Sequence, residues 1–435
     1  METPIVDFVK NYTKSNKARL HMPGHKGVPF LGIEQADITE IKGADELYSP
    51  EGIILRSEEN ASALFSTQKT VYSAGGSTQS IHAMLYLAKI KSKSKTVFAA
   101  RNAHKAFHYA CAKLECNIHW LYPEKSSHLC SCVITQKTLT EAFEKADTLP
   151  FAVYITSPDY LGKIADIKAL SAVCRQYNVP LLVDNAHGSY LAFCEKNLHP
   201  IALGADMCCD SAHKTLPVLT GGGYLHIAKD NRFGFAEHAV QAMSIFGSTS
   251  PSYLILQSLD LCNRYIDCKI KDDIKACRQK IEEIRAVMPV TDVSDEPLKI
   301  TADMRCVANR DVFEKAGIEP EYSDDDFTVF MLTPQNSDGD FAKLKEAFTK
   351  MQIVKIICEE PPVIPRGVQK ISVRDAIFSL SETVEIQYAV GRICAAPTVS
   401  CPPAIPIAVS GEEITPEHIE LFKKYNINRI SVVKE

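Results

Sequence analysis

The chain has 435 residues, of which 46% are hydrophobic and 23% charged, and its formal net charge is −5. This composition excludes a disordered or fibrous chain, and the length suits two domains of roughly 100–200 residues each. A negative net charge without a long basic run argues against nucleic acid or an anionic membrane as a partner.

The amino terminus and the cysteines favour a cytoplasmic protein. Met1-Glu2-Thr3-Pro4 lacks the basic start of a signal peptide, and no window reaches the roughly 18 apolar residues of a membrane span. The 15 cysteines contain no paired C-x-x-C knuckles. We therefore expect no metal site and interpret the cysteines as buried thiols in a reducing compartment.

Residues 1–45 are expected to form an arm. The apolar spacing over residues 5–12 predicts a short helix, and His21-Met22-Pro23-Gly24-His25-Lys26-Gly27 then interrupts regular structure. A loop with two histidines and a lysine either contacts a partner, lines a site or is simply solvated.

Strand and helix patterns alternate between residues 70 and 227, which predicts an α/β fold with a mostly parallel sheet. The expected strands are 71–74, 96–100, 151–156, 181–184, 205–209 and 222–227, and the expected helices are 79–90, 105–115 and 167–177. Polar groups follow five of the strands: Ser77 with Thr78, His104, Asp159 with Tyr160, Asp184 with His187, and Ser211 to Lys214. Ligands bind beyond the carboxyl ends of parallel strands, so these groups indicate a site.

A glycine-rich turn precedes the expected helix 79–90. Gly75-Gly76-Ser77-Thr78 leads into the amino terminus of that helix, where free N–H groups and the helix dipole favour a phosphate. The alternative is a capped helix without a ligand.

The pattern changes after about residue 260. A long amphipathic helix is expected over 272–288, followed by shorter strands and helices. We therefore expect an arm of residues 1–45, a large domain of residues 46–265 and a smaller C-terminal α+β domain of residues 266–435.

Two stretches together predict a pyridoxal 5'-phosphate (PLP) site. Lys214 lies in Ser211-Ala212-His213-Lys214-Thr215, where its amine can form a Schiff base and its neighbours can receive the phosphate. Asp184 ends an apolar strand and can keep the pyridine nitrogen protonated, which makes the cofactor an electron sink. Ser-x-x-Lys alone also begins other nucleophile motifs.

Several motifs in order resemble the bacterial ornithine/lysine/arginine decarboxylases, which are fold-type-I PLP enzymes with the aspartate-aminotransferase architecture. They are residues 21–27, 75–78, 101–105, 184–188 and 211–215, continued by 373–376, 389–393 and 402–406. The resemblance implies a PLP-binding large domain, a smaller C-terminal domain and at least a homodimer. The chain looks like the short form, without the receiver-like N-terminal wing domain of the long enzymes.

The resemblance also implies residue roles. Lys214 would bind the cofactor covalently, Asp184 would pair with the ring nitrogen, and His104 would stack on the ring unless it is a capping or core histidine. The other implied cofactor contacts are Ala186 on the ring, His187 near the ring hydroxyl or the Schiff base, Gly76, Ser77, Thr78, Ser211 and His213 at the phosphate, and Thr249 or Ser250 across a dimer interface. Arg374 and His25 are substrate candidates, although Arg374 equally suits a structural ion pair. Lys214 or His213 would donate a proton.

The implied reaction is decarboxylation of lysine, arginine or ornithine to the amine and CO2. The departures from the family pattern leave the substrate open; they are Asn185 for an acidic residue, Ala212 for threonine, Gly221–Gly223 for a bulkier run, and Cys401 and Ala404 in the Pro-Pro segment. Two alternatives stay open: a PLP-dependent aminotransferase or lyase acting on another amino acid, and a non-catalytic PLP-binding protein.

Overall fold

The computed structural model describes residues 1–124, 128–230, 232–354, 364–399 and 405–434. Two of the departures noted above, Cys401 and Ala404, lie outside these residues. Among the described residues, no helix combines the length and the apolar character that crossing a membrane requires.

The chain forms two compact units, and each is built from two separate stretches. The first consists of Met1–Ser92 and Pro180–Ile274, and the second of Lys93–Val179 and Lys275–Glu435. The expected division into residues 1–45, 46–265 and 266–435 stays a prediction. The units show instead which stretches pack most densely with one another.

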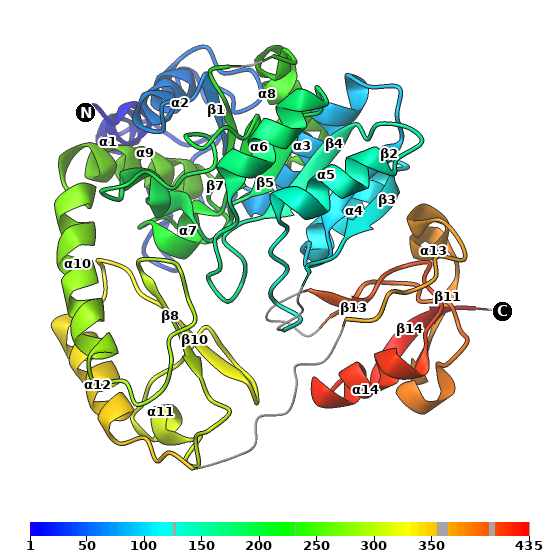
Figure 1. The fold of residues 1–435 in the computed structure, drawn as a ribbon. Coiled ribbons are helices and arrows are strands. Elements are labelled where there is room, and N and C mark those ends of the chain that lie inside the picture. Colours follow the sequence, from blue (N-terminus) through cyan, green and yellow to red (C-terminus); the bar gives the residue numbers. More distant parts are fainter. Residues whose placement is uncertain (125–127, 231, 355–363, 400–404, 435) are drawn as a thin grey trace. The chain divides into compact units, whose positions relative to one another are not determined.

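The first unit contains the following elements, most of which are labelled in Figure 1. They are α1 (Pro4–Lys14), α2 (Ile53–Leu64), β1 (Lys69–Ser73), α3 (Gly76–Ile90), β5 (Leu181–Asp184), the 3-10 helix η1 (Ser189–Phe193), β6 (Met207–Asp210), α7 (Ala212–Thr215), β7 (Gly223–Ile227), η2 (Phe235–His238), α8 (Ala239–Phe246) and α9 (Tyr253–Cys268). Helix α10 (Ile270–Arg285) begins in this unit and ends in the second.

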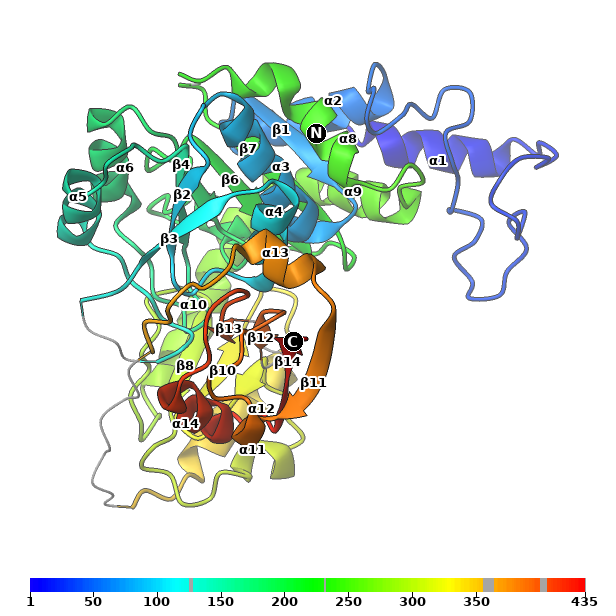
Figure 2. The ribbon, with the colours of Figure 1, turned by 90° about the vertical axis from the view of Figure 1, so that its right-hand side faces the viewer.

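The second unit contains the remaining elements. They are β2 (Thr96–Ala100), α4 (Lys105–Lys113), β3 (Asn117–Leu121), α5 (Gln136–Glu144), β4 (Ala152–Thr156), α6 (Ile167–Gln176), β8 (Lys299–Asp303), α11 (Val312–Lys315), β9 (Tyr322–Ser323), β10 (Phe327–Met331), α12 (Asp338–Thr349), α13 (Val373–Phe378), β11 (Ser381–Glu385), η3 (Ile386–Tyr388), β12 (Thr398–Val399), β13 (Pro406–Ala408), α14 (Pro416–Lys424) and β14 (Arg429–Val433). Helix α13 packs on α4 (Figure 2).

The principal sheet has seven strands and is mostly parallel. In the first unit the strands lie in the order β1-β7-β6-β5, and in the second in the order β4-β2-β3. β5 is parallel to β6, and β2 is parallel to β3 and β4, whereas β7 is antiparallel to both β1 and β6. The expected α/β fold is therefore confirmed.

One edge of the first unit's strands collects the polar residues that matter below. Because β7 is antiparallel to β1 and β6, the strands β1, β6 and β5 share one direction, and their carboxyl ends lie beside the amino end of β7. Pairing sets Ser73 opposite Gly223 and Asp210 opposite Tyr224. We call these strand ends, with Asp184 at the end of β5, the strand-end edge.

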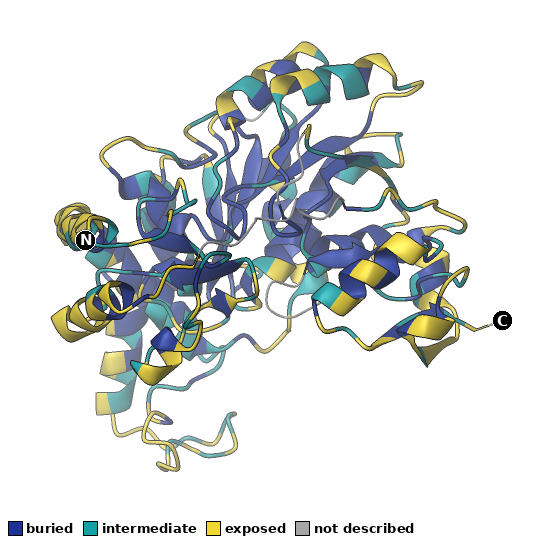
Figure 3. Cartoon of the chain, turned by 60° about the horizontal axis from the view of Figure 1, so that its bottom comes forward, coloured by how far each residue is buried: buried dark blue, intermediate teal, exposed yellow. Residues whose placement is uncertain are grey.

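Burial differs between the strands of the sheet and the surface helices. Strands β5 and β6 are buried at every position, while surface helices such as α10 alternate between buried and exposed residues (Figure 3). Helix α3 packs on β6, β7 and α8 and buries most of its apolar residues, including Ile81, Met84 and Leu85. This burial fixes the amino terminus of α3 relative to the strand-end edge.

Arg101, directly after β2, is the largest of the fully buried side chains in the second unit. Its guanidinium donates to the carbonyl oxygens of Pro406 and Ile407, at 2.8 Å each, and lies 3.8 Å from the Glu412 carboxylate. These contacts offset part of the cost of burying the charge and connect β2 to β13 within the second unit.

Most predicted elements are confirmed, with ends that match or are displaced by at most three residues. Two displacements affect the site. Helix α3 begins at Gly76 rather than Gln79, which places Ser77 and Thr78 in its first turn. Strand β6 spans Met207–Asp210 rather than 205–209, so Asp210 belongs to the strand and not to the loop.

A buried carboxyl group joins α2 to β1. Glu58 is 2% exposed and accepts a hydrogen bond of 2.9 Å from the Tyr72 N–H, while its second carboxyl oxygen has no partner among the described residues. Burial raises the pKa of Glu58 from 4.5 to about 8, although the Tyr72 N–H and Lys69 oppose the rise. The folded protein therefore binds this proton more tightly than the unfolded chain does.

We predict that stability falls as pH rises from about 4.5 to 8, because the unfolded chain loses this proton first. Glu58→Gln, which has no charge to bury, should flatten that slope by up to ~1.4 kcal/mol per pH unit. The measurement is denaturant unfolding at pH 5, 6.5 and 8. Exposed Glu59→Gln is the control. Equal slopes in all three proteins would contradict the assignment.

Candidate functional site

The turn between β1 and α3 is built from short contacts at the strand-end edge. The Ser73 hydroxyl lies 2.7 Å from the Gly76 carbonyl oxygen and 2.8 Å from Gln79 Oε1, and the Gly76 N–H donates to the Gly221 carbonyl oxygen at 2.7 Å. Gly76 has φ +65°, a conformation that favours glycine. These contacts fix the turn from which α3 begins.

The glycine run Gly221–Gly223 lets β7 approach this turn closely. A Cβ atom at Gly223 would lie 2.7 Å from the Asp210 carbonyl oxygen and 3.3 Å from the Gly76 carbonyl carbon. Gly221 has φ +96°. The packing at residue 223 leaves no room for a side chain, which explains why glycine stands here in place of a bulkier residue.

Two hydroxyls and one imidazole lie beside the first turn of α3. Ser211 Oγ donates to Ser77 Oγ at 2.8 Å. A Cβ built on Gly76 would meet only His213 Cε1, at 3.8 Å, so the space in front of Gly76 is open. The amino-terminal turn of a 15-residue helix offers N–H groups and the positive end of its dipole to an anion. The main-chain N–H groups of this turn, with the hydroxyls of Ser77 and Ser211, can bind a phosphate, and His213 borders the same space.

His213 is held in one tautomer. Its Nδ1 lies 2.9 Å from the Gly222 carbonyl oxygen, so Nδ1 carries the hydrogen and Nε2 is the free position of the neutral ring. Burial lowers the pKa of His213, the Gly222 carbonyl opposes this, and the Lys214 charge adds to it. At neutral pH the ring is therefore mainly uncharged.

Lys214 and His187 meet on adjacent strand ends. Lys214 Nζ lies 3.0 Å from His187 Nε2, with Lys214 on α7 after β6 and His187 in the loop after β5. At this distance the amine and the imidazole can share one proton. Such a pair suits an amine nucleophile.

Asp184 is buried at the end of β5. Its Oδ1 accepts a hydrogen bond from the Ala186 N–H at 3.2 Å and one from Cys209 Sγ at 3.5 Å. A carboxylate fixed in this way can pair with a cationic ring nitrogen, as expected from the sequence. Ala186, two residues on, is half-buried.

Other predicted site residues lie elsewhere. Thr78 is exposed in the first turn of α3, Thr249 and Ser250 are exposed between α8 and α9, and His25 pairs with Asp37 at 3.2 Å in the arm. The structure does not bring Thr249, Ser250 or His25 to the strand-end edge, whereas Thr78 follows Ser77 in the first turn of α3. The predicted roles of all four residues stay predictions.

Two further candidates belong to the second unit. His104 caps α4 by accepting from the Ala106 N–H at 3.1 Å, which is the capping alternative considered from the sequence. Arg374 donates to the Ala112 carbonyl oxygen at 3.2 Å and lies 3.6 Å from Glu115, as a structural ion pair would. The proposed stacking and substrate-binding roles of these residues stay predictions.

Asp159 and Tyr160, the fifth predicted strand end, make local contacts. The Asp159 carboxylate accepts from the Lys163 N–H at 2.9 Å, and Tyr160 Oη donates to Glu321 at 2.7 Å. Burial raises the pKa of Asp159 to about 6, against opposing contributions from Ser131, the Lys163 N–H and Lys299. These contacts close a turn in the second unit.

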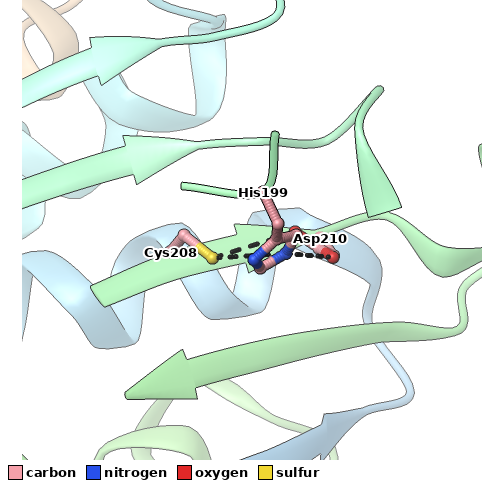
Figure 4. Close-up of side chains that lie close together, drawn as sticks. All are labelled: His199, Cys208 and Asp210. Carbon is pink, nitrogen blue, oxygen red and sulfur yellow. Dashed lines mark hydrogen bonds and ion pairs between the residues drawn. The ribbon is translucent and has the colours of Figure 1, made fainter. Parts of the chain in front are cut away.

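Sequence reasoning missed a buried polar cluster behind the strand-end edge. Asp210 accepts from Asn185 Nδ2 at 2.7 Å and from His199 Nε2 at 3.1 Å, and His226 Nε2 lies 3.3 Å away. Figure 4 shows His199 between Cys208 and Asp210. The signal in the sequence is the charged residue Asp210 directly after the predicted strand 205–209. The strand pattern alone places Asp210 in the following loop.

Comparisons with known proteins agree on one family. The family model "Orn/Lys/Arg decarboxylase, major domain" matches residues 3–370. The chain is 28% identical to "Uncharacterized protein YaaO" of Bacillus subtilis (strain 168), over 98% of this chain and 94% of that protein. It is 27% identical to "Arginine decarboxylase" of the same organism, over 97% and 93%.

The solved structures show the same fold. The Francisella novicida lysine decarboxylase LdcF superposes with a TM-score of 0.77 at 16% identity, over 99% of this chain and 81% of that one. The predicted architecture of the fold-type-I enzymes is thereby confirmed.

We predict that Gly223→Ala destabilises the protein by about 1–3 kcal/mol, because its Cβ would meet backbone atoms that cannot rotate away. Thermal unfolding of the variant checks this. Gly339→Ala is the control, since the nearest atom there is Ser337 Oγ at 3.5 Å on the exposed start of α12; it should be neutral or slightly stabilising. Similar melting temperatures for both variants would refute the close approach of β7.

Proposed function

Because the chain belongs to the Orn/Lys/Arg decarboxylase family, we propose that it removes the α-carboxyl group of a basic amino acid and releases CO2 and the corresponding amine. Enzymes of this family are PLP-dependent carboxy-lyases. The observation that supports the assignment best is the Lys214–His187 pair, at 3.0 Å, among strand ends that also present Asp184 and Ser77.

The strand-end edge fits PLP in three respects. The open space in front of Gly76, bordered by Ser77 and Ser211, suits the phosphate. The half-buried amine of Lys214 suits a covalent attachment, and the buried carboxylate of Asp184 suits the ring nitrogen. We assign these residues to the cofactor.

When bound, PLP supplies an acceptor for the electron pair that the leaving carboxylate gives up. Side chains of this protein would hold and transfer the protons. His187 Nε2 can take a proton from the Lys214 ammonium and return it across 3.0 Å. His213, whose Nδ1–H points at the Gly222 carbonyl, is better placed to orient a ligand than to donate a proton, so we assign the proton donor to Lys214.

Arginine is the first substrate to test. The relatives named arginine decarboxylase match almost the whole chain, while the lysine decarboxylase neighbours share the fold at lower identity. Lysine and ornithine have the same α-carboxylate and a terminal cation, so all three basic amino acids enter the test.

We predict that the purified holoenzyme converts one basic amino acid to its amine with equimolar CO2, measured by mass spectrometry and CO2 trapping. Lys214→Ala should lose the covalent cofactor absorbance and at least ~10³-fold of the rate, and His187→Gln about 10²-fold. Ser244→Ala, exposed on α8, is the control. Keto-acid consumption without CO2 would favour an aminotransferase, and cofactor binding without any turnover would favour a non-catalytic protein.

We also propose that the protein is a homo-oligomer. The arm loop after α1 exposes apolar side chains, with Leu20 93%, Phe30 82% and Leu31 85% exposed. The loop is nevertheless held in shape, because the Glu34 carboxylate accepts from the N–H groups of Phe30, Leu31 and Gly32, which lower the pKa of Glu34 to about 2. A pre-formed apolar surface suits a second copy of the chain.

Replacing Leu20, Phe30 and Leu31 by serine should convert the oligomer to monomer in sedimentation velocity, since these side chains supply the apolar contact. Leu149→Ser, 46% exposed beyond α5, is the control and should keep the assembly. A wild-type protein that sediments as a monomer at micromolar concentration would exclude the oligomer.

The cysteines support a cytoplasmic location, which we propose as well. None of the thirteen described cysteines is in a disulfide, and eleven of them are buried. Free thiols in this number suit a compartment that keeps them reduced.

A further inference from the structure

Asp210 is a charged residue inside the sheet. Its side chain is fully buried on β6, between β5 and β7. Burial would raise its pKa, but His199 and His226 overcome this and hold the pKa well below the usual range. Asp210 is therefore ionised in the folded protein and accepts hydrogen bonds from Asn185 and His199, while His226 lies close by.

The surrounding groups are arranged as donors. Asn185 Nδ2 donates to Oδ1 at 2.7 Å, His199 Nε2 donates to Oδ2 at 3.1 Å, and His226 Nε2 lies 3.3 Å from Oδ2. The other ring nitrogen of His226 lies 2.8 Å from Thr70 Oγ1 on β1. One carboxylate thus connects β1, β5, β6, β7 and the loop that carries His199.

Two of these connections reach the active site through the backbone. Asn185 directly follows Asp184, and its own N–H donates to the Cys209 carbonyl oxygen at 3.0 Å. Asp210 directly precedes Ser211, which bonds to Ser77. The Asn185–Asp210 bond therefore joins the strand ends that carry the ring-nitrogen and phosphate residues.

The amide at residue 185 matches the carboxylate at residue 210. An acidic residue at 185 would place two carboxyl groups at hydrogen-bond distance in a buried site, where both cannot be ionised. An amide removes that conflict and supplies the donor. The departure at Asn185 and the charge at Asp210 are complementary.

We propose that Asp210 is a positioning residue, which fixes the end of β5, where Asp184 lies, through its bond to Asn185 and so sets how tightly PLP is held. This rests on the proposed PLP site but does not depend on the substrate or the reaction. It predicts that the Asn185–Asp210 pair affects cofactor affinity, beyond any effect on stability.

A matched control lies at the other end of the same strand pair. Asp206, just before β6, is buried and accepts from the Leu181 N–H at the start of β5, at 2.9 Å. Asp206→Asn should lower the melting temperature, since it disturbs the same two strands. It should leave PLP affinity within twofold, because it lies at the opposite end of the strands from Asp184.

The test measures PLP release from the purified holoenzyme by equilibrium dialysis, with the melting temperature of each variant. Asn185→Asp should raise the PLP dissociation constant at least tenfold, and the exchange Asn185→Asp with Asp210→Asn should return it to within threefold of wild type. If Asn185→Asp does not fold, Asn185→Ala removes the donor without adding charge and should give the same rise.

Several outcomes would overturn the proposal. An unchanged dissociation constant with a lowered melting temperature would make the pair purely structural, and absence of rescue by the exchange would show that the two residues are not matched. The nearby His199, Cys208 and Asp210 offer three possible metal ligands within 4.8 Å of one another (Figure 4). Stoichiometric metal lost in His199→Gln would make this a metal centre. If wild-type protein binds no PLP, the proposed function itself fails.

Discussion

The hydrogen-bonded register of β1, β7, β6 and β5 is the constraint on which the site depends. A shift of one residue in any of these pairs would turn the strand's side chains to the opposite face. The register places Ser73 beside Gly223 and Asp210 beside Tyr224, and so brings the turn before α3 next to α7, which carries Lys214. Main-chain pairing therefore determines which side chains lie together at the site.

The antiparallel strand β7 gives this edge its particular character. In a purely parallel arrangement every strand would bring only its carboxyl end, followed by a loop or helix. Here the amino end of β7 lies beside the carboxyl ends of β1 and β6. The segment that leads into β7 therefore passes between these two strand ends, where side chains have little room. Gly221–Gly223 supply that segment, and the lack of a side chain at residue 223 keeps the turn before α3 close to β6.

The sequence was a good guide to local structure and to residues next to strand ends. Lys214, Asp184, Ser77 and Ser211 follow apolar runs, and parallel strands bring such ends together whatever the sequence between them. Asp210 could not be recognised in this way. The role of Asp210 depends on its contacts with His199 and His226, which become its neighbours only in the folded chain. In the sequence, a single acidic residue before Ser211 is indistinguishable from a loop residue.

The composition of the two units was also beyond prediction from one sequence. Periodicity identifies elements, but it does not say which of two stretches an element packs with, because both offer similar apolar faces. The predicted C-terminal domain of residues 266–435 stays a prediction, and α10 begins in one compact unit and ends in the other. Tertiary packing alone decides such boundaries.

The discontinuity of the first unit has a consequence for synthesis on the ribosome. Thr70 on β1 contacts His226 on β7, 156 positions further along the chain. At roughly 5–20 residues per second, β1 is exposed for on the order of ten to thirty seconds before its partner emerges. During that time its buried positions and unpaired backbone are open to other chains. Completion of the first unit is therefore a late event in translation, and nascent chains that stop before β7 present an open strand edge.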